Sequence, residues 1–221
     1  MGANKFQTVG LALCLLSTAA VSHGFAETRL SIIVYDAARV RPKTLARAEH
    51  LAGVILATAG ISPSWDAGSL GDLGSLAADF TAYDREECDA EQSPAMLRVQ
   101  ILPRAPAGFA AHALGLSLPC AKRGVQVTIY ADRISHVTDN GGPTFDRTLA
   151  YVFAHELGHV LLRSAAHARA GLMKGTWSKT DWQRAAVSVI PFTPSEVEQI
   201  SAFQEPPAET KFAQLASLRA R

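Results

Sequence analysis

The sequence predicts an α+β fold in which a sheet is flanked by helices. Hydrophobic residues make up 48% of the 221 residues and charged residues 19%, a balance typical of a globular domain with a buried core. Segments rich in β-branched residues occur together with segments whose apolar residues recur at helical spacing. Their order along the chain is strand, helix, several strands, long helix, loop and helix, which indicates a single layered domain.

A leader segment precedes this domain. Lys5 is the only charged residue before Glu27, and an apolar run covers residues 9–20. The stretch ends in small residues at Ala26, so these features together are typical of a secretory signal peptide over residues 1–26, cleaved after Ala26. An uncleaved membrane anchor is the alternative, although the apolar run is shorter than the roughly 20 residues that a spanning helix needs.

The mature chain, residues 27–221, is expected to be secreted or periplasmic, with no stable membrane insertion once the signal is removed. It keeps two cysteines, Cys88 and Cys120. An even pair in an oxidising compartment predicts one disulfide, with two free thiols as the alternative. The whole chain has 21 basic against 20 acidic residues and no basic cluster, which argues against a nucleic-acid partner.

The first elements are expected at the start of the mature chain. Residues 30–40 are β-rich and predict a strand. Residues 43–59 have apolar side chains at helical spacing, with Pro42 before them and Gly60 after them as start and stop signals. A short second strand is predicted over residues 61–66.

The later elements lead to one long helix. A loop rich in Gly, Ser and Asp covers residues 68–92. Thr144 or Asp146 can cap a helix that runs to about Arg163. The other predicted elements are strands over 95–103, 112–118 and 124–134, of which the last alternates most clearly, a loop over 138–143, and helices over 180–186 and 193–203.

The long helix carries the sequence HELGH, residues 155–159. Histidines four residues apart lie on one face of a helix, so the ring nitrogens of His155 and His159 can converge on one Zn²⁺. Glu156 follows the first histidine and can reach a water at the metal, where it would act as a general base. The sequence therefore predicts one catalytic zinc ion at this helix.

A zinc hydrolase needs a third protein ligand and an open position for water. One candidate is His167, eight residues after His159, and the other is a glutamate of the later helix, Glu196 or Glu198. On one continuous helix His167 would lie about 12 Å along the axis from His159 and could not share the metal. The helix must therefore end near residues 163–164 and turn back, and His167 is the favoured ligand.

The segment HELGHVLLRSAAHARAGLM resembles the metzincin clan of zinc peptidases, whose HExxHxxGxxH pattern is followed by a tight turn containing methionine. The resemblance implies Glu156 as the base, Met173 as the residue of that turn, and an edge strand at 112–118 that pairs with substrate. It also implies a mixed twisted sheet flanked by helices, one of which carries HExxH. The three zinc ligands that it implies are His155, His159 and His167.

Three departures make this chain an outlying member of that clan. The second and third histidines are separated by eight residues instead of six, and the glycine that lets the metzincin helix turn is missing, since residues 163–166 are Arg, Ser, Ala and Ala. No tyrosine follows Met173. The specific match is therefore confined to the motif and its turn.

The chemistry implied is hydrolysis of peptide bonds in a peptide or protein by a zinc-dependent endopeptidase. An alternative keeps the zinc and Glu156 but acts as an amidase on a non-protein or cell-wall peptide substrate. A second alternative is a non-catalytic secreted binding protein whose fold is stabilised by zinc. Structural zinc sites normally use four protein ligands, and only three are convincing here, which favours the open catalytic site.

Overall fold

The computed structural model describes residues 28–72, 96–110, 112–121 and 124–204. The predicted signal peptide lies outside these residues, as do Cys88 and most of the predicted loop over 68–92. The cleavage site and the Cys88–Cys120 disulfide therefore stay predictions. None of the helices in the described ranges is long and apolar enough to cross a membrane.

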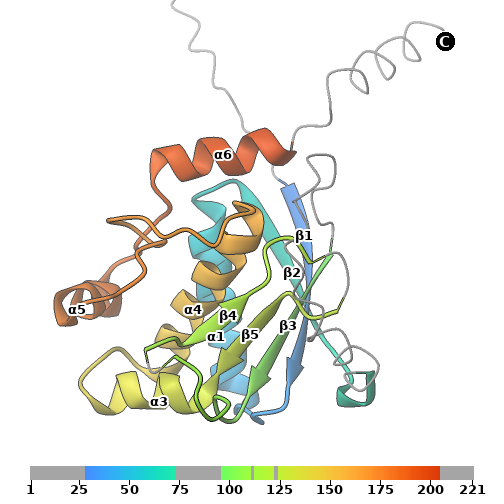
Figure 1. The fold of residues 1–221 in the computed structure, drawn as a ribbon, viewed down its shortest axis with the longest axis vertical. Helices are drawn as coiled ribbons and strands as arrows, with labels where there is room; N and C mark the ends of the chain where they lie inside the picture. The colour runs from blue at the N-terminus through green and yellow to red at the C-terminus, as the bar shows by residue number, and fades with distance from the viewer. Residues whose placement is uncertain (1–27, 73–95, 111, 122–123, 205–221) are drawn as a thin grey trace, which may run out of the picture.

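A five-stranded mixed sheet forms the centre of the domain (Figure 1). Its strand order is β2-β1-β3-β5-β4, and every pair is parallel except β4 with β5. The strands are β1 (Thr28–Asp36), β2 (Ile61–Ala67), β3 (Met96–Leu102), β4 (Gly115–Ser117) and β5 (Val127–Tyr130). The short antiparallel strand β4 thus lies at one edge of the described sheet.

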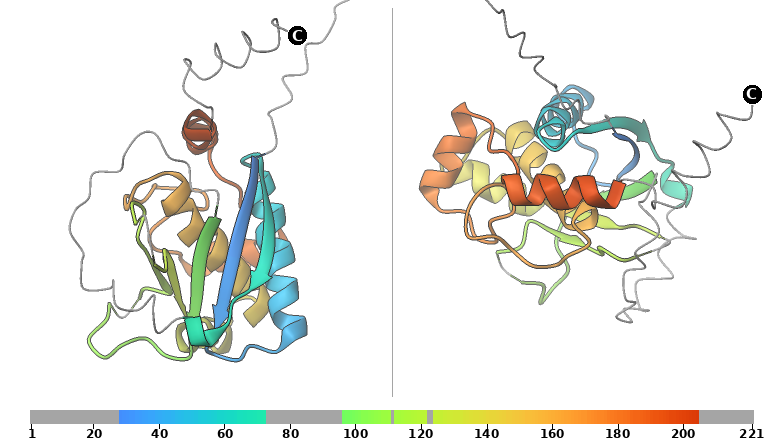
Figure 2. Two further views of the ribbon diagram at one scale, coloured as in Figure 1. Left: turned by 90° about the vertical axis from the view of Figure 1, so that its right-hand side faces the viewer. Right: turned by 90° about the horizontal axis from the view of Figure 1, so that it is seen from above.

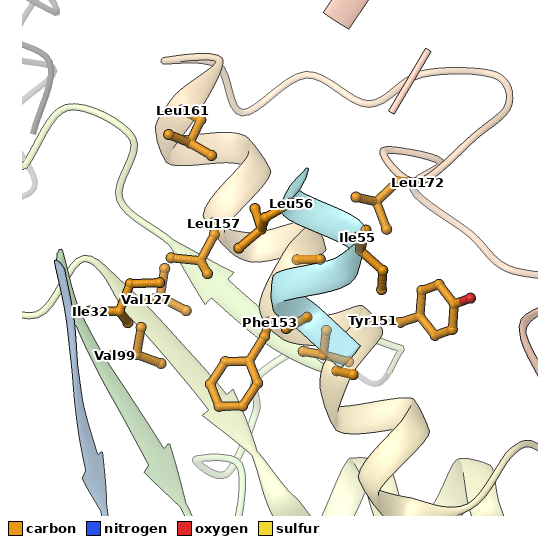
Figure 3. Close-up of a cluster of buried hydrophobic side chains, with 14 of the residues drawn as sticks. Ile32, Ile55, Leu56, Val99, Val127, Tyr151, Phe153, Leu157, Leu161 and Leu172 are labelled. Carbon is orange, nitrogen blue, oxygen red and sulfur yellow. The ribbon is translucent and has the colours of Figure 1, made fainter. Parts of the chain in front are cut away.

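Two long helices pack side by side against one face of this sheet (Figure 2). They are α1 (Pro42–Ala57) and α4 (Phe145–Leu161). Alternate residues of β1, such as Ile32, point into the same core as Val99 and Val127, where they meet Phe153 and Leu157 of α4 (Figure 3). Three shorter helices complete the described fold: α3 (Ala131–Asp139), α5 (Lys179–Val187) and α6 (Pro194–Gln204).

Helix α4 is buried on almost all sides, with nearly every residue from Thr148 to Leu161 inaccessible to solvent. Such a helix is held between the sheet and α1 on one side and the C-terminal segments on the other. The predicted α+β fold, with a sheet flanked by helices and a central helix carrying HELGH, is therefore confirmed. The central helix is also a rigid support for any side chain that it presents.

The predicted strand over 124–134 was wrong in its second half. Strand β5 ends at Tyr130, and α3 begins at Ala131. Asp132, in the first turn of α3, accepts hydrogen bonds from the amides of Ala105 and Arg133. An acidic acceptor at a helix N-terminus stabilises the helix. The alternating sequence pattern continues past Tyr130 and therefore does not reveal that a helix begins at Ala131.

The first strand is also shorter than predicted, ending at Asp36 instead of residue 40. The Asp36 carboxylate accepts a hydrogen bond of 2.8 Å from the amide of Val40, and Arg39 adopts a left-handed conformation with φ of 55°. This side-chain hydrogen bond closes a turn, so the strand ends although the composition of residues 37–40 favours a strand.

Candidate metal centre

The structure brings three histidines together at the C-terminal half of α4. One ring nitrogen from each of His155, His159 and His167 lies within 4.8 Å of the others. The Nε2 atoms of His155 and His159 are 3.2 Å apart. Their rings come from the same face of α4, whereas His167 comes from the segment that follows the helix. No other group of this kind occurs among the described residues.

The third histidine reaches the cluster because α4 ends abruptly. The amide of Ser164 donates to the carbonyl of His159, and the amide of Arg163 donates to the carbonyl of Val160. These two hydrogen bonds form a Schellman motif, in which the residue after the cap takes a left-handed conformation. Arg163 has that conformation, with φ of 52°. An arginine therefore occupies a left-handed position that glycine usually fills at the end of a helix.

Replacing Arg163 tests this account of the helix end. We expect the Arg163→Gly variant to be more stable than Arg163→Ala by about 1 kcal/mol, since a Cβ disfavours the left-handed conformation. Both variants lack the arginine side chain, so the comparison isolates the backbone. Denaturant unfolding of the metal-free protein measures it. Equal stability of the two variants would contradict the strain assigned to Arg163.

The other nitrogen of each helix histidine is bound to a backbone carbonyl. His155 Nδ1 lies 2.9 Å from the carbonyl oxygen of Leu172, and His159 Nδ1 lies 2.8 Å from that of Ser164. Because a carbonyl only accepts, both Nδ1 atoms carry the proton and both Nε2 atoms have a free lone pair. Metal-binding histidines usually make this second hydrogen bond.

This arrangement fits a zinc ion. At the usual Zn–N distance, two nitrogens of a tetrahedral site lie about 3.3 Å apart, close to the 3.2 Å between the two Nε2 atoms. The pKa of His155 is lowered to about 4, chiefly by burial and also by the neighbouring His159 and His167, against the raising effect of the Leu172 hydrogen bond. Burial also lowers the pKa of His159. Both rings are therefore neutral, the form that binds metals.

A tight turn lies beneath the histidines. Gly171 has φ of 78°, and the amide of Lys174 donates to its carbonyl at 3.4 Å. Within the turn, the Leu172 carbonyl accepts from His155, and the side chain of Met173 is 1% exposed. A Cβ at Gly158 of α4 would lie 2.5 Å from Met173 Sδ, so the methionine packs directly on the HELGH glycine. The structure thus places Met173 in a tight turn that packs on α4 below the cluster.

Glu156 lies on the other side of the cluster, against strand β4. Its side chain is 7% exposed. A Cβ at Gly115 would lie 2.8 Å from its carboxylate, and the hydroxyl of Ser117 hydrogen-bonds both its carboxylate and its main-chain carbonyl. Burial raises the pKa of Glu156 to about 7, against the lowering effect of the Ser117 hydrogen bond. Sequence reasoning missed Ser117, because its contact depends on how β4 pairs with the sheet.

The glutamates considered as alternative ligands do not join the histidines. The Glu196 carboxylate accepts a hydrogen bond of 2.7 Å from the amide of Thr193, at the start of α6. The Glu196 amide lies 3.4 Å from the Thr193 hydroxyl in return. Within the described ranges the metal-type cluster consists of histidines only, with neither Glu196 nor Glu198 in it.

A cleft of about 960 Å³ opens over the cluster and Glu156. One wall is aromatic, since Trp177 stacks between Tyr151 and Trp182 at ring-centroid distances of 5.3 and 4.6 Å. The opposite wall contains strand β4 and the first turns of α3. No local sequence pattern places Tyr151 or Trp182 here, because the wall forms only when the segment after the tight turn folds back on α4.

No protein-family model matches this chain, and no curated protein resembles it closely enough in sequence to match. Solved structures that match this chain in fold include the following three. A zinc-dependent peptidase from Methanocorpusculum labreanum has a TM-score of 0.49 at 14% identity, covering 76% of this chain and 99% of its own. An archaemetzincin from Methanopyrus kandleri has 0.46 at 13%, covering 83% and 98%. Metalloproteinase-II from Bacteroides fragilis has 0.46 at 12%, covering 83% and 55%.

Proposed function

We propose that this chain is a zinc-dependent endopeptidase that hydrolyses peptide bonds of a peptide or protein substrate. One observation carries the proposal: three histidines converge on one point, with the Glu156 carboxylate beside them in an open cleft. His155, His159 and His167 would hold one zinc ion. When bound there, zinc supplies Lewis-acid chemistry toward the scissile carbonyl and toward water.

Glu156 is the proton carrier in this proposal. Its carboxylate accepts a proton from the attacking water, so that the hydroxide adds to the carbonyl carbon of the substrate. The same group then donates that proton to the nitrogen of the leaving amine as the C–N bond breaks. A carboxyl group that is buried beside the three histidines is placed to perform both steps.

The free edge of strand β4 is the observation that favours an extended peptide as the substrate. In the described part of the sheet β4 pairs only with β5, so its other edge offers main-chain donors and acceptors beside Glu156. A peptide that adds to this edge would run along the cleft past the three histidines. The aromatic wall of Tyr151, Trp177 and Trp182 favours a large apolar side chain on one side of the bond that is cleaved.

Two alternative functions differ from this proposal, one in its substrate and the other in its zinc ligands. An amidase would keep the histidines and Glu156 but take a non-protein or cell-wall peptide substrate in the same cleft. A zinc-stabilised binding protein would need a closed site with a fourth protein ligand. Among the described residues only three ligands converge, and they lie in an open cleft, which favours catalysis.

We also propose that the chain acts outside the cytoplasm. The support is the leader over residues 1–26, whose single charge, apolar run and small residues at Ala26 are typical of a signal peptide. The mature chain 27–221 would then be one catalytic domain in a secreted or periplasmic setting. A disulfide between Cys88 and Cys120 belongs to the same proposal, since it needs an oxidising compartment.

Metal analysis tests the proposed function most directly. We expect close to one zinc per mature chain in protein purified without added metal, because three histidine side chains are already brought together there. A peptide-library digest should show cleavage that a chelator abolishes and added zinc restores. Protein that binds no zinc even when zinc is supplied would refute the proposal. Stoichiometric zinc without cleavage of any peptide would favour the non-catalytic alternative.

A further inference from the structure

Strand β4 presents two small residues to Glu156. Gly115 pairs with Ile129 of β5 and Ser117 pairs with Val127, and both partners are buried in the core under α4. Residues directly opposite each other in an antiparallel pair share a face of the sheet, so Gly115 and Ser117 also face α4. A Cβ at Gly115 would lie 2.8 Å from Glu156 Oε1, which shows how closely the strand backbone approaches the carboxylate.

The hydroxyl of Ser117 contacts Glu156 at two points. Its Oγ lies 2.9 Å from the main-chain carbonyl oxygen of Glu156 and closer still to the carboxylate oxygen Oε2. Ser117 is itself buried, with 9% of its surface exposed. Within the described ranges no other side chain hydrogen-bonds this carboxylate. One hydroxyl therefore fixes the rotation of the carboxylate and leaves Oε1 to take part in chemistry.

A hydroxyl suits both states of a general base. It has one proton and two lone pairs, so it donates to Oε2 while Glu156 is a carboxylate. When Glu156 holds the proton taken from water, the same Oγ accepts from it and turns its own proton toward the main-chain carbonyl. Neither state leaves a buried polar group without a partner, whereas alanine at this position would leave the carboxylate unpaired.

We propose that Ser117 is a positioning residue of the reaction, which acts by holding the Glu156 carboxylate in its productive orientation. This inference rests on the proposed peptidase function. Among the described residues Ser117 makes no hydrogen bond to the three histidines, and its hydroxyl points to Glu156 of α4 and not along the free edge of β4. Zinc binding and substrate pairing should therefore be independent of its hydroxyl.

The experiment compares Ser117→Ala and Ser117→Thr with the wild-type full chain. Loss of a residue that orients a reacting group typically costs about ten- to a hundredfold in activity. We expect Ser117→Ala to lower kcat by that factor while KM, zinc content and melting temperature stay close to wild type. Ser117→Thr keeps the hydroxyl on a strand residue and should recover most of kcat.

A second comparison separates positioning from packing. In the Glu156→Gln background, Ser117→Ala should change the residual turnover less than twofold, because its effect passes through the carboxylate. Wild-type kcat in Ser117→Ala would overturn the inference, and so would equal losses in both backgrounds or a loss of zinc. If wild-type zinc-loaded protein cleaves no peptide, the proposed function itself fails. If it cleaves and Ser117→Ala cleaves equally well, only the role of Ser117 fails.

Discussion

Replacing Glu156 with glutamine should lower turnover by about two to four orders of magnitude while zinc stays bound. Glutamine has the same shape and can still hydrogen-bond Ser117, but its amide cannot accept the proton of the attacking water. The three histidines that would hold the metal are unchanged. Measuring kcat together with zinc content on the same preparation checks both halves of this expectation.

The matched variant is His167→Ala, which should lose zinc occupancy and activity together. His167 is the most exposed of the three histidines, and its ring packs on Gly175, where a Cβ would come within 2.7 Å. Removing it leaves two ligands, which hold zinc weakly. Full zinc in His167→Ala, with loss of zinc in Glu196→Ala or Glu198→Ala, would assign the third ligand to a glutamate. Turnover retained by Glu156→Gln would refute the assignment of Glu156 as the general base.

The central helix and its HELGH motif could be predicted from the sequence because both depend only on the local spacing of residues. Spacing of four places His155 and His159 on one helix face whatever surrounds the helix. The rise per residue predicts a helix end near residues 163–164 if His167 is to reach the metal, and α4 ends at Leu161 with Leu162 as its C-cap. Helix geometry alone thus predicts that the helix ends before His167.

The rest depended on contacts between distant segments. Nothing in the local sequence marks Arg163 as the left-handed residue of a Schellman motif, since glycine is the usual signal there. The Ser117 contact exists because β4 pairs antiparallel with β5 in one particular register, and a shift by one residue would turn the hydroxyl away. The aromatic wall likewise requires the segment after Met173 to fold back over Tyr151.

Gly158 lies where α4 packs against the tight turn that contains Met173. In an ordinary helix interior, Gly→Ala stabilises by roughly 0.5–1 kcal/mol because glycine loses more backbone entropy on folding. Here the new Cβ would lie 2.5 Å from Met173 Sδ and 2.9 Å from Phe192 Cε1. Both neighbours are buried, so neither has free space into which to move.

We therefore expect Gly158→Ala to destabilise the metal-free protein by about 1–3 kcal/mol, the usual cost of overpacking a core. Gly53→Ala in α1 is the matched control. A Cβ at Gly53 would lie 3.5 Å from Pro63 Cγ, an ordinary contact, so the same substitution should be neutral or stabilising there. Denaturant unfolding in the presence of a chelator measures both variants without the contribution of bound zinc.

Zinc affinity should follow the same substitution. Pushing Met173 away from α4 also displaces the adjacent Leu172 carbonyl, which holds His155 Nδ1 at 2.9 Å. Loss of such a second hydrogen bond typically weakens metal binding about ten- to a hundredfold. Met173→Ala alone opens a cavity, but in that background Gly158→Ala should cost less than in the wild type, because the clash with sulfur is gone. If Gly158→Ala stabilises the protein as much as Gly53→Ala does, the tight turn does not pack on the motif helix as the structure has it.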